Sequence, residues 1–126
     1  MALAPESYGR MSQEASPKSA SAVNVTQAFL VGGGICAAGQ VILEVFTMLG
    51  FGRLEASAWT SVMLVLASAF TTGMGWYGRL AKHAGAGTLV PITGFANAIS
   101  SAAIEAQSEG LVLGVGTKIF TIAGPV

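Results

Sequence analysis

The sequence has few charged residues and no aspartate. Charged side chains make up 10% of its 126 residues, against roughly 25% in an ordinary globular protein. Six Lys and Arg residues balance six acidic residues, all of them Glu, so the formal net charge is zero. A nucleic-acid-binding domain needs an excess of basic charge, which this chain lacks. Because 52% of the residues are hydrophobic, the composition favours a membrane protein over a soluble domain.

Residues that commonly build catalytic and metal sites are scarce. The single cysteine, Cys36, excludes an internal disulfide and a cysteine-based zinc or iron–sulfur site. Since Cys36 lies in an apolar run, we expect its thiol to be buried and inert. With one histidine, His83, a catalytic triad would need a distant glutamate and a serine that nothing places beside them. We expect no catalysis, no cofactor and no bound metal.

Two long apolar stretches predict membrane-spanning helices at residues 28–51 and 58–77. Each reaches the roughly 20 residues that cross a bilayer core. Trp59 and Trp76, near the two ends of the second stretch, are typical of side chains at the two membrane surfaces. Residues 1–24 are polar and poor in bulky apolar groups, so we expect a flexible tail. Residues 25–126 form the predicted membrane domain.

Basic residues are distributed unequally around the two predicted spans. If the spans form a hairpin, the tail and residues 78–83 share one side of the membrane. Arg53 alone lies on the other side. By the positive-inside rule, the N-terminus is then cytoplasmic. The basic residues on the predicted cytoplasmic side are Arg10, Lys18, Arg79 and Lys82.

Small and polar residues recur along one side of the first predicted span. We expect this face to pack against another helix, because small residues let two backbones approach closely. A carboxylate inside a span costs roughly 2.5–3.5 kcal/mol and normally faces protein or water. Glu44 either does so or lies near the helix end and extends to the interface. The residues of this face are Gly32, Gly33, Cys36, Gln40 and Glu44.

A third apolar stretch, residues 84–104, carries no charge but is interrupted by glycines and a proline that an unbroken helix would not choose. Polar residues follow Pro91 at four-residue steps and continue past the end of this stretch. Irregular backbone is tolerated at membrane depth only where it is buried in protein or lines water. We therefore predict that this segment faces a pore or a partner. The alternative is a loop between helices at the membrane surface.

The helix that starts at Pro91 would direct amide N–H groups and its positive dipole end at an anion. Glu105 and Glu109 either contact a cation or form a solvated helix end at the membrane boundary. The residues predicted to line a pore or bind the solute are Pro91, Thr93, Gly94, Asn97, Ser101, Glu105 and Glu109.

The last stretch, residues 110–126, is too short and too rich in glycine for a complete crossing. It looks like the opening half of a segment whose remainder is missing here. The predicted fold is therefore all-α: a small polytopic helical membrane protein with two spanning helices, a Gly/Pro-broken third segment and an incomplete fourth.

Three strings carry a resemblance to a known family: AFLVGGGICAAGQ at 28–40, AGAGTLVPITGFAN at 84–97 and SEGLVLGVGTKIF at 108–120. With these, residues 25–126 resemble the stage V sporulation protein AC family, which includes the related AE-type subunits. The resemblance implies an integral protein of the inner spore membrane, without catalytic activity. It supplies no list of functional residues, so the site residues above rest on the sequence pattern.

The resemblance also implies a function and partners. Such proteins act with sibling membrane subunits and a soluble AD-type subunit to move dipicolinic acid with calcium. Uptake occurs into the forespore during sporulation, and release occurs during germination. We therefore expect a subunit of a hetero-oligomeric channel in the lipid bilayer. The alternative is a non-conducting scaffold that anchors the soluble partner.

Overall fold

The computed structural model describes residues 5–16 and 20–125. Over these residues the regular structure is entirely helical, which confirms the predicted all-α fold. Elements η1 and η2 are 3₁₀ helices, and η3 is a π-helical stretch. The order along the chain is α1 (Pro5–Ala15), α2 (Ser21–Met48), α3 (Arg53–Gly73), α4 (Trp76–Ala84), η1 (Gly85–Thr88), α5 (Pro91–Glu105), η2 (Ala106–Glu109), η3 (Leu111–Gly116) and α6 (Thr117–Ala123).

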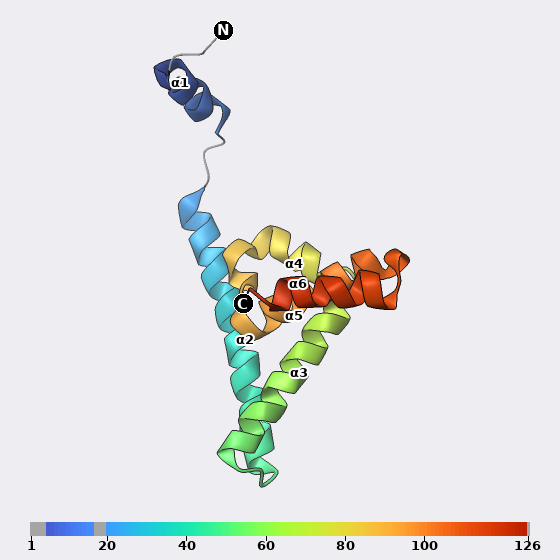
Figure 1. Ribbon diagram of the computed structural model, residues 1–126. Coiled ribbons are helices and arrows are strands. Elements are labelled where there is room, and N and C mark those ends of the chain that lie inside the picture. The colour runs from blue at the N-terminus through green and yellow to red at the C-terminus, as the bar shows by residue number, and fades with distance from the viewer. Residues whose placement is uncertain (1–4, 17–19, 126) are drawn as a thin grey trace.

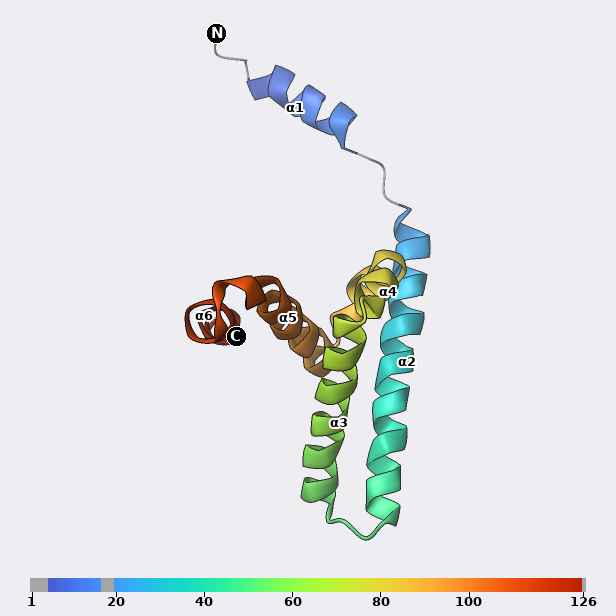
Figure 2. The same cartoon turned by 90° about the vertical axis from the view of Figure 1, so that its right-hand side faces the viewer.

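Helices α2 and α3 form an antiparallel hairpin (Figure 2). Of the helices in the described ranges, these two are long and apolar enough to cross a membrane. Large apolar side chains such as Phe29, Leu66 and Phe70 are exposed along them. Such a surface suits lipid chains or neighbouring subunits rather than water. The prediction of two candidate spanning helices is confirmed.

The helix boundaries differ from the predicted spans. Helix α2 starts at Ser21, upstream of the predicted 28, because residues 21–27 contain no glycine or proline that would stop a helix. Helix α3 ends at Gly73, where the prediction ran on to 77. Gly75, with φ +72°, turns the chain in a left-handed conformation that favours glycine. Trp76 therefore begins α4, which runs from the end of α3 toward α2 (Figure 1).

The range 1–24, which we predict to be a tail, includes α1 and the start of α2. Helix α1 lies apart from the packed helices (Figures 1 and 2), with Tyr8 and Met11 exposed. The flexibility of this range and its cytoplasmic location stay predictions.

After α4 the chain packs back onto the α2–α3 hairpin and then leaves it. Element η1 contacts α2, and α5 packs on α3. The stretch from α5 to α6 forms a second hairpin that projects sideways from α2 and α3 (Figures 1 and 2). The predicted fourth segment, 110–126, contains η3 and α6, which together form a single short apolar helix, Leu111–Ala123.

Small residues hold these elements together. The buried apolar residues are four alanines and Tyr77, and in the described part of the chain no large side chain is fully buried. In a bilayer, lipid chains are as apolar as leucine, so close backbone approach and hydrogen bonds between helices stabilise the fold instead. The buried polar residues fit this pattern: Thr60, Ser68, Thr88 and Thr93.

Candidate functional site

The third apolar stretch is broken where the sequence predicts a break. Helix α4 ends at Ala84, and Gly85 follows with φ +50° at the start of the 3₁₀ turn η1. Helix α5 then begins at Pro91, a position where the missing N–H of proline costs no hydrogen bond. The stretch is therefore two helix ends joined by a tight turn rather than a continuous span.

The turn is held on α2 by direct backbone contact. A Cβ added at Gly87 would lie 2.8 Å from the Cα of Ala28 and would also clash with the carbonyl oxygen of that residue. A Cβ added at Gly32 would lie 3.3 Å from the carbonyl oxygen of Gly87. Gly32, which belongs to the predicted packing face of α2, therefore contacts the broken segment.

Three hydrogen bonds from α3 and α4 hold the broken segment from the other side. The hydroxyl of Ser68 donates to the carbonyl oxygen of Thr93 at 2.6 Å. The hydroxyl of Thr72 donates to Oδ1 of Asn97 at 2.8 Å. Tyr77 donates to the carbonyl oxygen of Thr88 at 2.7 Å. Because Tyr77 and Thr88 are buried, the last bond anchors the turn in a site shielded from solvent.

The predicted polar line along α5 divides into two parts. Thr93 is buried and Asn97 is half-buried, both on the side of α3, whereas Ser101, Glu105 and Glu109 are exposed. Four residues overshoot a helical turn by about 40°, so Glu105 points about 120° away from Thr93 around α5. The structure thus brings the first two residues to a helix interface and leaves the others outside it.

The two remaining predicted residues lie at the start of α5. Pro91 is exposed, and Gly94 is half-buried close to the preceding turn. A Cβ added at Gly94 would lie 3.0 Å from the carbonyl oxygen of Thr88. Gly94 therefore lets η1 fold back tightly on α5.

A cavity of about 260 Å³ lies within the second hairpin, between the end of α5 with η2 and the helix α6. Glu105 and Glu109 line it on one side, and Lys118 and Thr121 of α6 line it on the other. Both carboxylates therefore line one cavity, as their four-residue spacing predicts. The ammonium group of Lys118 lines the same cavity, and the sequence pattern does not predict this. No local signal could have identified Lys118, because its proximity depends on how the hairpin closes.

The predicted packing face of α2 does not act as one surface. Gln40 donates from Nε2 to Oε1 of Glu44 at 2.8 Å, and both side chains are exposed near the end of α2. Gly33 has open space around it. The expectation of a buried thiol is wrong for this chain, since Cys36 is exposed on α2, where no other helix covers it.

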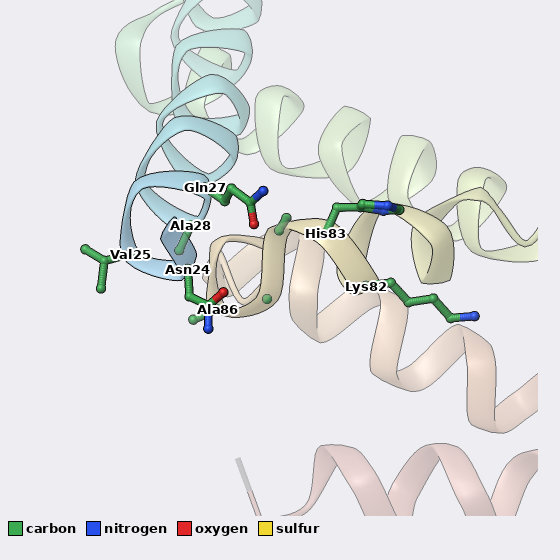
Figure 3. A pocket seen from close by; sticks show the side chains of 9 residues that line it. Asn24, Val25, Gln27, Ala28, Lys82, His83 and Ala86 are labelled. Atoms are coloured by element: carbon green, nitrogen blue, oxygen red, sulfur yellow. The ribbon is translucent and has the colours of Figure 1, made fainter. Parts of the chain in front are cut away.

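A second cavity, of about 400 Å³, lies between the start of α2 and the end of α4 (Figure 3). Asn24 and Gln27 line it from α2, and Lys82 and His83 line it from α4. The sequence pattern around Lys82 indicates only the orientation of the chain in the membrane. Within residues 5–16 and 20–125, no three His, Cys, Asp or Glu side chains gather as metal ligands would.

Replacing Thr72 by valine should weaken the contact between α3 and α5, because Asn97 then loses its hydrogen-bond partner. Hydrogen bonds between membrane helices contribute roughly 0.6 kcal/mol on average and up to about 1.7 kcal/mol. Thr71→Val is the matched control, since the Thr71 hydroxyl contacts carbonyl oxygens of its own helix, 2.9 and 3.0 Å away. Unfolding in detergent should show a lower free energy for Thr72→Val. Equal values for the two variants would contradict the bridging role of Thr72.

The sequence of this chain matches a known protein family. The family model described as SpoVAC/SpoVAEB sporulation membrane protein matches residues 24–126. The chain belongs to the SpoVAC/SpoVAEB sporulation membrane protein family. It is 46% identical over 122 residues to Stage V sporulation protein AC of Bacillus subtilis (strain 168), covering 96% of this chain and 81% of that protein. No solved structure matches the chain significantly.

The SpoVAC/SpoVAEB match includes nearly all of α2 and everything that follows it. The broken segment and its contacts with α2, α3 and α4 therefore lie within the part of the chain that defines the family. Helix α1 lies before that part. The chain is thus a sporulation membrane protein with two candidate membrane helices.

Proposed function

We propose that this chain is a subunit of a channel that passes dipicolinic acid with calcium across the inner spore membrane. Family membership supports the association with sporulation and with a membrane. The observation that carries the channel proposal is α5, a helix that begins at a proline inside an uncharged apolar stretch. Sibling membrane subunits and a soluble AD-type subunit are the proposed partners.

The start of α5 provides positive electrostatic potential for an anion. Pro91 has no N–H, and no side chain caps the start of the helix. The N–H of Gly94 bonds back to the carbonyl oxygen of Val90 at 2.7 Å, which closes the first turn. The N–H groups ahead of that bond carry the positive end of the helix dipole. A dicarboxylate is stabilised by such groups when it passes through a site with little water.

Asn97 and Ser101 are the proposed hydrogen-bonding residues of the path. Oδ1 of Asn97 lies 2.8 Å from the Thr72 hydroxyl, which also lies 2.7 Å from the carbonyl oxygen of Ser68. With Oδ1 accepting from Thr72, the two N–H groups of the same amide are the proposed donors to the solute. Ser101 lies one turn further along α5 with an exposed hydroxyl. In this arrangement Thr93 and Gly94 position the helix start on α3 and η1, and Asn97 and Ser101 contact the dicarboxylate.

The cavity at the end of the second hairpin is the proposed mouth of the path. Glu105 and Glu109 would contact calcium or repel anions that arrive without it, and Lys118 partly offsets their charge. Glu105→Gln combined with Glu109→Gln should raise the flux of calcium-free dipicolinate several-fold at low salt. The increase should shrink at high salt, where charges are screened. A stopped-flow assay of dipicolinate release checks this, with Glu55→Gln, far along the chain on α3, as the control.

The channel proposal is tested by the accessibility of a cysteine at Asn97. Cys36→Ser removes the native thiol, and Asn97→Cys then introduces a single reactive group. Labelling by a charged, water-soluble thiol reagent in the assembled complex supports a water-filled path. Failure to label in the complex, with labelling of the isolated chain, contradicts it.

The scaffold alternative rests on α1. This helix lies apart from the others with Tyr8 and Met11 exposed, as expected of a segment that binds a soluble partner (Figure 1). Tyr8→Ser combined with Met11→Ser should then release the soluble partner from membranes. If the doubly substituted chain still supports dipicolinate flux, the conducting and anchoring roles belong to different parts of the chain.

A further inference from the structure

An apolar groove lies under α4, with Thr93 of α5 as the one residue of the broken segment in its wall. It has a volume of about 380 Å³ and opens between α2, α3 and α4. Its walls include Ile35 and Ala38 of α2, Leu64 of α3, and Trp76 and Leu80 of α4. Two of these helices are the candidate membrane spans, so the apolar lining of the groove lies next to the predicted bilayer.

The hydroxyl groups around this groove are already paired inside the protein. Ser68 donates to the carbonyl oxygen of Thr93 at 2.6 Å, and Thr71 donates to that of Ala67 at 2.9 Å. Tyr77 donates to the carbonyl oxygen of Thr88 at 2.7 Å. With these bonds made, the wall presents hydrocarbon surface to any occupant. A hydrocarbon chain fits this wall, whereas a carboxylate solute would lose its hydration there without replacement.

The exposed side of α4 is basic. Arg79 and Lys82 are exposed one turn apart, and the helix contains no acidic residue. In Figure 3 the Lys82 side chain extends away from Asn24 and Gln27 of α2. Helices with Trp and Leu on one face and Lys and Arg on the other lie in the plane of the membrane surface. Arg79 lies one helical turn, three residues, from Trp76 of the groove wall, so the basic side of α4 begins at the edge of the groove.

We propose that this groove is a binding site for one anionic phospholipid. One acyl chain lies in the groove against Trp76 and Leu80, and the headgroup phosphate is bound by Arg79 and Lys82. Anionic headgroups complement this basic rim, and the cytoplasmic leaflet, which the predicted orientation places at α4, is rich in them. A zwitterionic lipid fills the same groove but binds the rim less tightly. This site does not depend on whether the broken segment conducts.

Fluorescence quenching of Trp76 tests the proposal. Trp59→Phe leaves Trp76 as the single tryptophan of the full chain. The chain is reconstituted in equimolar phosphatidylglycerol and phosphatidylcholine, with brominated acyl chains on one lipid or the other. We expect brominated phosphatidylglycerol to quench Trp76 more strongly. Arg79→Gln and Lys82→Gln should each reduce this preference, by up to roughly fivefold, and salt should reduce it too.

Three controls make the outcome specific. Arg53→Gln, at the far end of α3, should leave the preference unchanged. Ala38→Leu, which fills the groove, should reduce quenching by both lipids. Inorganic phosphate, which has the charge without the chain, should not displace the brominated lipid. Equal quenching by the two lipids, or a preference that survives the combined Arg79→Gln and Lys82→Gln substitution, would overturn the site. So would unchanged quenching in Ala38→Leu, since the chain would then lie elsewhere.

Discussion

Replacing Asn97 by aspartate is expected to lower dipicolinate flux by roughly tenfold or more while leaving α5 attached to α3. Aspartate keeps a carboxylate oxygen to accept the Thr72 hydrogen bond but removes both N–H donors and adds negative charge. A hydrogen bond to a charged group contributes about 1.5–3 kcal/mol, and about 1.4 kcal/mol corresponds to a factor of ten. The rate of dipicolinate release from liposomes measures the effect.

Two further variants separate the contact with the solute from the contact with α3. Thr72→Val removes one of the two side-chain hydrogen bonds from α3 to α5 that are described above, but it keeps the N–H donors of Asn97, so flux should fall much less than in Asn97→Asp. Asn97→Leu removes both the hydrogen bond with Thr72 and the N–H donors, so it should lower the flux and also the stability of the α3–α5 pair. If Asn97→Asp conducts like the unsubstituted chain, Asn97 does not line the path.

Replacing Gly87 by alanine should detach the turn η1 from α2. The added methyl group would meet backbone atoms of Ala28, which cannot rotate aside as a side chain would. Overpacking of this kind costs roughly 1–3 kcal/mol. The turn connects α4 to α5, so its displacement should also disturb the start of α5 and reduce flux. Thermal unfolding in mild detergent gives the stability difference.

Gly33→Ala is the matched control for this substitution. Gly33 lies on α2 next to Gly32, but nothing lies within 4 Å of a Cβ placed there. Alanine is favoured over glycine inside a helix by about 1 kcal/mol, so this variant should be at least as stable as the original chain. Equal stability of Gly87→Ala and Gly33→Ala would contradict the close contact between η1 and α2.

The spans and the break could be predicted because both depend on local sequence. Uncharged apolar length identifies α2 and α3, and a proline flanked by glycines identifies the break before α5. The predicted end of α3 is wrong because the apolar run continues through Gly75 to Trp76, whereas the chain turns at that glycine. A glycine just beyond a helix is a recognised stop signal, so this boundary could have been predicted.

The neighbours of the polar residues could not be predicted in the same way. A four-residue spacing places Thr93 and Asn97 on neighbouring sides of α5, but it does not say which helix covers them. The drift of about 40° per step turns these two toward α3 and leaves Glu105 exposed. The pairing of Asn97 with Thr72 joins positions 25 residues apart, and only the packing of α5 on α3 determines it.

Dipicolinate release from liposomes that contain this chain, alone and with its sibling membrane subunit, shows directly whether the chain forms a channel. Insertion is first confirmed by protection of α2 and α3 from protease. Release should depend on the presence of the chain and should fall sharply in Asn97→Asp. If liposomes with both subunits inserted release no dipicolinate, the result would contradict a channel and favour the scaffold.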